Sequence, residues 1–278
     1  MLYCLKIKLT QNAAIRAMGI AGLNLLFYSK NIKTWFEKHI FNPYEIDGNE
    51  SADYAVVQSG VILDHLNISN KKILEIGPGG SYYLACILLK KGAEKVFVID
   101  NENHHFFPEK ELDIYRKIYP QSLKNNTINP EKIAIIHYDK EGAIPLSPDS
   151  IDIIYSNAVF EHVFEPKELL IDCQKILTNT GHMLHQIDFR DHIFNQKSLF
   201  FLKIPNLFFD ILFKNTGMWI NRLRYSDWKK LFSSLKQTKI IFCYKQYGEI
   251  ILSEKQKLHT SEDMQVTSML IMLEKYAK

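Results

Sequence analysis

The chain has 278 residues, 46% of them hydrophobic, and a formal net charge of +3. This length allows one substantial core with an appendage, and the nearly balanced charge gives no reason to expect a nucleic-acid partner. Cys4, Cys86, Cys173 and Cys243 are scattered without a C-x-x-C pair, so neither a zinc site nor a disulfide framework is indicated. We expect a cytoplasmic protein, because no secretory signal and no membrane-spanning apolar run is evident.

The first 69 residues predict an N-terminal helical extension. Helical patterns cover residues 13–28 and 32–39, and turn signals follow at Asn42-Pro43 and Asp47-Gly48. From residue 70 to residue 278, strand and helix patterns alternate. This alternation predicts an α/β fold with a doubly wound, mostly parallel sheet and right-handed crossovers.

The most informative segment is an apolar run at residues 72–76 that leads into Gly77, Gly79 and Gly80. The apolar run suits a buried parallel strand. Glycine tolerates positive φ and lets a ligand approach the bare backbone. A helix is expected over residues 82–91, so the segment predicts a strand, a nucleotide-binding turn and a helix.

A second strand is expected at residues 96–99, and its end at Asp100 completes a βαβ unit. A dinucleotide fingerprint has glycine at the first, third and sixth places of the loop, but the sixth place here is Tyr82. An NAD-dependent reductase or epimerase is therefore only an alternative, further weakened by the lack of an obvious Y-x-x-x-K active-site pair. A non-catalytic scaffold or peripheral membrane protein is another alternative.

The E-x-G-x-G string that begins at Glu75, followed by an acid at the next strand tip, resembles motif I of the class I S-adenosylmethionine-dependent methyltransferases. The resemblance continues at residues 152–163, which look like the fourth strand and its loop, and at residues 181–188, which look like the fifth strand. The H-Q-I-D-x-R-D-H string at residues 185–192 is similar to a bacterial, methyltransferase type 11-like subgroup. The family resemblance implies a Rossmann-like, seven-stranded sheet and S-adenosyl-L-methionine as the cofactor.

Further strands are expected at residues 133–136 and 240–243, and a last, antiparallel one at residues 266–273. Helices are expected over residues 166–177, with Pro166 at the first position, and after Ser226 as the N-cap.

The resemblance also implies roles for individual residues. Asp100 would accept both ribose hydroxyls, Asp139 would lie near the adenine amine, and Tyr138 could stack there instead. The expected cofactor-binding residues are Glu75, Gly77, Pro78, Gly79, Asp100, Asn101, Tyr138, Asp139, Asn157 and His162.

Methyl transfer is an in-line displacement, so the enzyme mainly has to align its two substrates, and a base is needed only if the acceptor loses a proton. His192 is our first candidate for that base and His162 the second. Strand alternation places His185 and Asp188 on opposite faces, so they should not share a site. Asp188, Asp191 and His192 could offer metal ligands, but they lack a defined ligand spacing, and we predict no metal.

Residues 190–224 are predicted to form a substrate-cap insertion. Its apolar segment, residues 198–213, has three interpretations: a lid over an acceptor, core packing for the N-terminal helices, or weak contact with a membrane surface. Arg222 and Arg224 could bind an anionic acceptor, although solvated or helix-capping arginines are commoner. We predict a small-molecule or saccharide acceptor that is methylated at oxygen.

Overall fold

The computed structural model describes residues 48–100, 109–193, 199–214, 219–250 and 262–277. The helices expected at residues 13–28 and 32–39, and the expected cofactor contact Asn101, lie outside the described residues.

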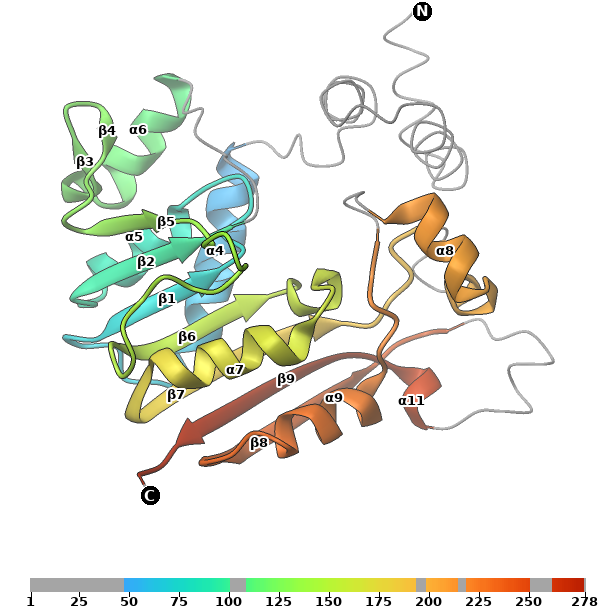
Figure 1. The fold of residues 1–278 in the computed structure, drawn as a ribbon. Helices are drawn as coiled ribbons and strands as arrows, with labels where there is room; N and C mark the ends of the chain where they lie inside the picture. The colour runs from blue at the N-terminus through green and yellow to red at the C-terminus, as the bar shows by residue number, and fades with distance from the viewer. Residues whose placement is uncertain (1–47, 101–108, 194–198, 215–218, 251–261, 278) are drawn as a thin grey trace, which may run out of the picture.

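In the part of the chain that is described, a seven-stranded sheet forms the centre of the molecule (Figure 1). The strands run in the order β5-β2-β1-β6-β7-β9-β8, and β9 is antiparallel to both of its neighbours. Their bounds are β1 Lys72–Ile76, β2 Lys95–Ile99, β5 Ile133–Ile136, β6 Ile151–Asn157, β7 Leu177–Asp188, β8 Thr238–Tyr247 and β9 Val266–Lys275. The expected doubly wound, mostly parallel sheet with an antiparallel last strand is confirmed.

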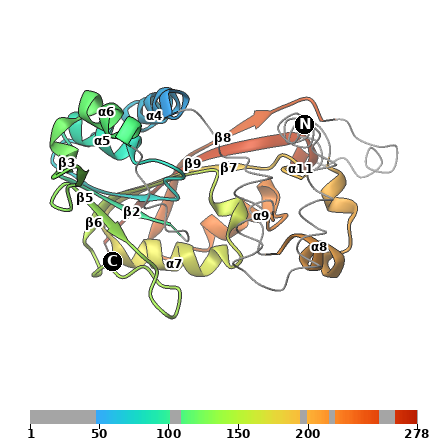
Figure 2. The same cartoon turned by 90° about the horizontal axis from the view of Figure 1, so that it is seen from above.

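Helices cover both faces of this sheet (Figure 2). One face carries α4 Gly48–Leu63, α5 Tyr83–Lys90 and α6 Glu109–Ile118, and the other carries α7 Pro166–Ile176 and α9 Tyr225–Ser233. Shorter elements are η1 Pro120–Ser122, the hairpin of β3 Leu123–Lys124 and β4 Thr127–Ile128, η2 Phe160–His162, η3 Phe200–Lys203, α8 Asn206–Phe213 and α11 Glu262–Gln265. The helical layers explain why the central strands read as unbroken apolar runs, since neither face of these strands meets water.

The expected alternation of side chains along the fifth strand, β7, is confirmed by the two hydrophobic cores on opposite faces of the sheet. Leu184 packs in the core under α4 and α5, whereas Met183 and Ile187 pack in the core under α7 and α9. The same holds on β1, where Ile73 and Leu74 enter opposite cores. Helix α4 also joins the first core through Ala55 and Ile62, so residues 48–63 act as a covering layer of the sheet.

The N-cap expected at Ser226 is wrong. Helix α9 begins at Tyr225, its N-cap is Arg224, and Ser226 lies inside the first turn. The Arg224 backbone N–H donates to Asp227 Oδ2 at 3.1 Å, and the Ser226 backbone N–H donates to Asp263 Oδ1 at 2.8 Å. Two carboxylates therefore satisfy the helix start, and the serine hydroxyl is not needed there. The helix start expected at Pro166 is confirmed.

The predicted insertion builds a third, small core of its own beyond the ends of β6 and β7 (Figure 1). Its buried side chains are Ile193, Leu199, Phe201, Phe209, Phe213 and Ile220. Ile250 and Met264, from outside the insertion, also pack against this core. The alternative of core packing for the N-terminal helices concerns helices that lie outside the described residues. Among the described helices, each is too short or too polar to cross a bilayer.

Candidate functional site

Four parallel strands end at the same edge of the sheet, and each ends beside a residue singled out in the sequence. Gly77 follows β1, Asp100 follows β2, and β6 and β7 end in Asn157 and Asp188. In open α/β sheets the carboxyl ends of the strands form the crevice where ligands bind. The fold therefore brings these residues to one edge of the sheet, although Gly77 and Asp188 lie 111 positions apart in the sequence.

The glycine-rich loop after β1 has the backbone that only glycine adopts readily. Gly77 has a φ of 70° and Gly79 a φ of 69°, and the Gly77 N–H donates to the Ile99 carbonyl at 2.8 Å. A Cβ on Gly77 would lie 2.4 Å from Val159 Cγ2, whereas one on Gly79 would meet no atom within 4 Å. Gly80, expected to share this flexibility, does not use positive φ. Gly77 thus allows close packing, and Gly79 leaves its backbone accessible.

This difference predicts unequal costs for two alanine substitutions. Gly77→Ala combines left-handed strain with overpacking and should lower the free energy of unfolding by about 3 kcal/mol. Gly79→Ala carries only the strain and should cost about 1 kcal/mol. In a Val159→Ala background, which removes both methyl groups, the cost of Gly77→Ala should fall close to that of Gly79→Ala. Denaturant unfolding checks this, and equal costs for the two single variants would contradict the packing role of Gly77.

Glu75, the last but one residue of β1, is a buried carboxyl with an unsatisfied oxygen. Its side chain is 4% exposed, and Oε2 has no hydrogen-bond partner among the described residues. Burial, and then the nearby charge of Asp100, raises the pKa of Glu75 to about 8. A buried, unpaired carboxyl oxygen beside an open glycine loop fits a ligand that brings a cationic or hydrogen-bonding group.

One backbone N–H at the start of helix α5 already has a protein partner. The Tyr82 backbone N–H donates to the hydroxyl of Tyr115, on α6, at 2.8 Å in a buried position. In dinucleotide-binding proteins this helix start receives the pyrophosphate. Tyr82 and Tyr115 together therefore argue against a dinucleotide at this loop.

At the end of β6 and just after it, the side chains of Asn157 and Glu161 contact α4 and the end of β7. Asn157 Nδ2 donates to the hydroxyl of Tyr54, on α4, at 2.6 Å. Glu161 is 3% exposed, its Oε1 accepts from the Asp188 N–H at 3.3 Å, and its Oε2 has no partner in the described parts of the chain. Burial raises the pKa of Glu161 to about 8. A second buried carboxyl thus lies at the same edge of the sheet as Glu75.

The two candidate bases are brought together next to Asp188. The rings of His162 and His192 have centroids 5.1 Å apart, and His192 Nε2 lies 3.4 Å from Asp188 Oδ2. His162 Nδ1 donates to the Trp219 carbonyl at 2.7 Å, because a carbonyl can only accept. Burial, and then the neighbouring His192, lowers the pKa of His162 to about 4. His162 is therefore neutral at physiological pH.

Asp188 is the ionised partner in this cluster. Burial opposes its ionisation, but hydrogen bonds from His192 and Arg190 outweigh that effect and hold the pKa of Asp188 well below its usual range. Arg190 donates Nε to both carboxylate oxygens at 2.9 Å and Nη2 to Oδ2 at 2.5 Å. The side chain of His192 is 19% exposed, so it can meet a ligand while a fixed carboxylate supports it. Chemically, this pair can accept a proton.

His185 has a different environment from the other two histidines. It is fully buried, its Nδ1 lies 2.8 Å from Ser156 Oγ, and its ring packs beside Phe160 and Phe232. Burial lowers the pKa of His185 to about 3. His185 is thus a neutral core residue, and it does not share a site with Asp188.

Tyr138 and Asp139 follow β5 at the edge of the crevice. Asp139 is exposed, and its Oδ1 accepts the N–H groups of Glu141 at 3.0 Å and Ala143 at 2.7 Å. Tyr138 packs against the core under α7, and burial raises the pKa of its hydroxyl. Asp139 therefore has a turn-forming role in addition to any contact with a ligand.

Of the three possible metal ligands, Asp188 and His192 lie together, whereas Asp191 bonds elsewhere. Asp191 is 1% exposed, and its Oδ1 accepts the Ile193 N–H at 2.9 Å within the insertion's own turn. Over the described ranges, no group of three or more His, Cys, Asp or Glu side chains is placed to hold a metal ion.

The two arginines of the predicted basic cluster hold the insertion in place. Arg224 is 8% exposed and donates to the carbonyls of Phe189 at 2.6 Å and Val266 at 3.0 Å. Arg222 donates to the Leu202 carbonyl at 2.8 Å and to Asn206 Oδ1 at 2.9 Å. These bonds account for both side chains without an anionic acceptor.

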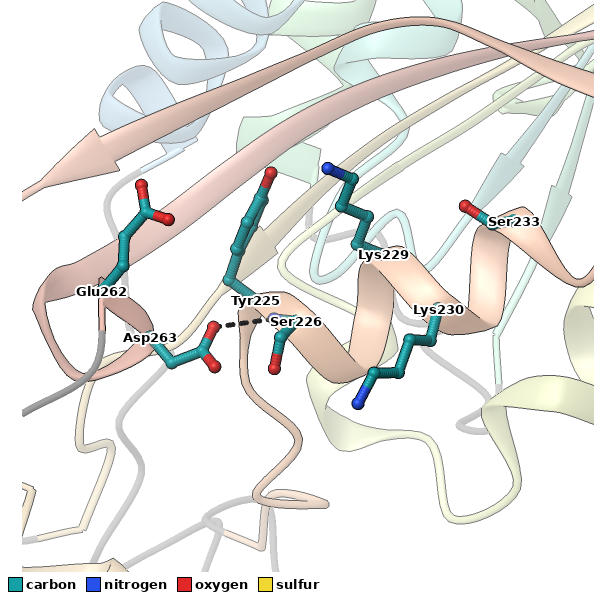
Figure 3. A pocket seen from close by; sticks show the side chains of 7 residues that line it. All are labelled: Tyr225, Ser226, Lys229, Lys230, Ser233, Glu262 and Asp263. Atoms are coloured by element: carbon teal, nitrogen blue, oxygen red, sulfur yellow. Dashed lines mark hydrogen bonds between the residues drawn. The ribbon is translucent and has the colours of Figure 1, made fainter. Parts of the chain in front are cut away.

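A hollow of about 420 Å³ lies away from this edge, between α9 and α11 (Figure 3). Tyr225 and Lys229 line it and have the Y-x-x-x-K spacing that the sequence reasoning missed. Helix α9 packs on β8 and β9, which β6 and β7 separate from β1 and its glycine loop. The pair therefore lies apart from the loop where a dinucleotide would bind, and the hollow is not the candidate active site.

The two buried carboxyls predict how stability depends on pH. A raised folded-state pKa means that the folded protein binds more protons than the unfolded one, so stability is lost as pH rises toward 8. Glu161→Gln should reduce this loss, by up to about 1.4 kcal/mol per pH unit for each carboxyl. The double variant Glu75→Gln/Glu161→Gln should lose most of the remaining decrease in stability with rising pH. Denaturant unfolding between about pH 7 and about pH 8 separates this effect from His162 and His185, whose lowered pKa values cost stability only in acid. Above about pH 8 the loss should level off.

Glu131→Gln is the matched control, because Glu131 is exposed and its ion pair with Lys124 lowers its pKa. It should leave the pH dependence above neutrality unchanged. A wild-type stability that is flat over this range would contradict the protonated state of both buried carboxyls.

Comparison with solved structures defines the fold class. An S-adenosylmethionine-dependent methyltransferase from Mesorhizobium loti matches with a TM-score of 0.51 and 14% identity, over 82% of this chain and 100% of that chain. The 4+2 cyclase SpnF matches with a TM-score of 0.52 and 9% identity, over 84% and 86% of the two chains. No curated protein sequence matches the chain. The fold is the Rossmann-like fold of class I methyltransferases.

The family follows from the sequence match within this fold. Residues 74–185 match the family model described as a methyltransferase domain, a range that runs from β1 through most of β7. These residues are a methyltransferase domain of the class I, S-adenosylmethionine-dependent kind, and S-adenosylmethionine is its cofactor.

Proposed function

We propose that this methyltransferase moves a methyl group to a hydroxyl oxygen of a small-molecule or saccharide acceptor in the cytoplasm. The observation that carries the proposal is the His192–Asp188 pair at the carboxyl edge of the sheet. A hydroxyl is a poor nucleophile until its proton is removed, so oxygen methylation is the reaction that uses a supported histidine best.

The residues at the glycine loop fit the cofactor. The open backbone at Gly79 and the unpaired Oε2 of Glu75 would face its amino acid part, and Asp100 would accept its ribose hydroxyls. Pro78, Asn101, Tyr138, Asp139 and Asn157 are proposed as further contacts around it. The bound cofactor supplies a methyl group on a cationic sulfonium, from which a neutral thioether departs as an excellent leaving group.

The remaining chemistry belongs to the chain's own side chains. His192 would take the acceptor's proton at a ring nitrogen, and the fixed carboxylate of Asp188 would orient the ring and stabilise the resulting charge. His162, held by the Trp219 carbonyl, would line the site as a neutral ring. Its low pKa keeps this ring neutral near neutral pH.

Calorimetric titration with S-adenosylmethionine, its demethylated product and NAD, run in parallel, tests the cofactor part of the proposal. We expect saturable one-site binding of the first two ligands and none of NAD. Binding of NAD alone would favour a reductase or epimerase, and binding of no ligand would favour a scaffold. Labelled cofactor then allows acceptors to be screened, and transfer only to nitrogen or carbon would contradict oxygen methylation.

A further inference from the structure

Helix α8 of the insertion exposes large apolar side chains. Leu207 is 69% exposed, Phe208 59% and Ile211 47%, while Phe209 and Phe213 on the opposite face are buried in the insertion's core. We call the three exposed side chains the α8 patch. A helix that is apolar on both faces is normally buried on both, so a second surface is expected to cover the outer one.

Lysines flank this helix at both ends and lie beside further exposed rings. Lys203 Nζ is 5.8 Å from the ring centroid of Phe200, which is 48% exposed. Lys214 Nζ is 4.1 Å from the ring centroid of Phe164, which is 55% exposed. The acidic residue of α8, Asp210, accepts a hydrogen bond from Trp219 Nε1 at 2.9 Å. Exposed aromatic and aliphatic side chains bordered by lysines suit an anionic bilayer surface.

Helix α4 also exposes apolar side chains, but the helix itself carries no positively charged side chain. Val56 is 57% exposed and Val57 63%, but α4 contains no lysine or arginine and carries Glu50 in its first turn. The combination of apolar side chains and flanking positive charge therefore distinguishes α8 from α4.

We propose that the α8 patch docks this protein on the surface of an anionic lipid bilayer, with Lys203 and Lys214 at the headgroups. The docking helix is tied to the candidate site, because Asp210 binds the Trp219 ring and the Trp219 carbonyl binds His162. Docking would place the bilayer beside the carboxyl edge of the sheet. If the proposed function holds, this position favours an acceptor that is itself anchored in the membrane.

Vesicle flotation of the full-length protein tests the docking without any methylation assay. The vesicles are phosphatidylcholine alone and phosphatidylcholine mixed with phosphatidylglycerol. We expect flotation with the anionic vesicles and less of it at high salt. Leu207→Glu/Phe208→Glu should reduce partitioning at least tenfold, a change of about 1.4 kcal/mol that the burial of two such side chains easily exceeds. Lys203→Ser/Lys214→Ser should remove about tenfold of the preference for anionic vesicles.

Val56→Glu/Val57→Glu on α4 is the matched control and should float like the parent. The proposal would be overturned if the parent did not float. It would also be overturned if the α4 control lost as much flotation as Leu207→Glu/Phe208→Glu. Light scattering and thermal unfolding of Leu207→Glu/Phe208→Glu test whether something other than a bilayer covers the α8 patch. A change of oligomeric state would assign the patch to a second copy, and a clear loss of thermal stability would assign it to another segment of this chain. Cofactor titration reports separately on the proposed function.

Discussion

Asp100→Ala should weaken binding of S-adenosylmethionine by about 100-fold, the largest effect that we expect on cofactor affinity. Two hydrogen bonds from ribose hydroxyls to one carboxylate are charge-assisted, and each such bond contributes about 1.5–3 kcal/mol. Calorimetric titration of the variant gives the dissociation constant directly. Asp100 directly follows β2, which pairs with β1 in the centre of the sheet. Thermal unfolding therefore has to show that the variant remains folded.

Asp113→Ala is the control for this substitution, since Asp113 lies on α6 and pairs with Arg116 at the surface. It should bind the cofactor like the parent. If Asp100→Ala also binds as tightly as the parent, then Asp100 does not hold the ribose and the ligand assignment at the tip of β2 is wrong.

His192→Ala should lower kcat for methyl transfer by about 100-fold to 10,000-fold, the range typical for loss of a general base. Affinity for S-adenosylmethionine should change little, because the proposed role of His192 is toward the acceptor. Asp188→Asn keeps the shape of the side chain but removes its charge, so it should lower kcat less than His192→Ala does. Both values are measured in the labelled-cofactor assay with the first acceptor that a screen yields.

His182→Ala is the control, because His182 lies within β7, six residues before Asp188 and away from the crevice. It should leave kcat unchanged. A pH profile separates catalysis from structure: loss of the acidic limb in His192→Ala supports a base, whereas an unchanged profile with a lower rate would mean that His192 only shapes the site. An Asp188→Asn variant with the parent's kcat would remove Asp188 from the mechanism.

The histidines show where pattern reasoning about the site succeeds and where it stops. Alternation along a strand separated His185 from Asp188 correctly, because successive side chains of a strand point to opposite faces whatever the rest of the fold. The contact between His162 and His192 could not be predicted in this way. It depends on β6 and β7 being neighbours and on the path of the chain after each strand.

The insertion shows the same limit. Its apolar sequence favoured core packing or a lid rather than a membrane contact, and the structure shows that Phe209 and Phe213 pack inward while Leu207 and Phe208 face outward. The sequence left anion binding, solvation and helix capping open for Arg224, and in the fold it is the N-cap of α9 and a buried donor to backbone carbonyls. Burial depends on which partner surface arrives, and that surface comes from segments far along the chain.

The sequence by itself determined the βαβ unit, the glycine loop and the acid at the tip of the second strand. These features are local, because apolar periodicity and the positive φ of Gly77 and Gly79 depend only on neighbouring residues. Only the tertiary structure decided that Glu161, His162 and His192 meet around Asp188 and that the Trp219 carbonyl holds His162 in place. The physical reason is that these contacts join residues up to 57 positions apart, so sheet order and burial, rather than local propensity, create them.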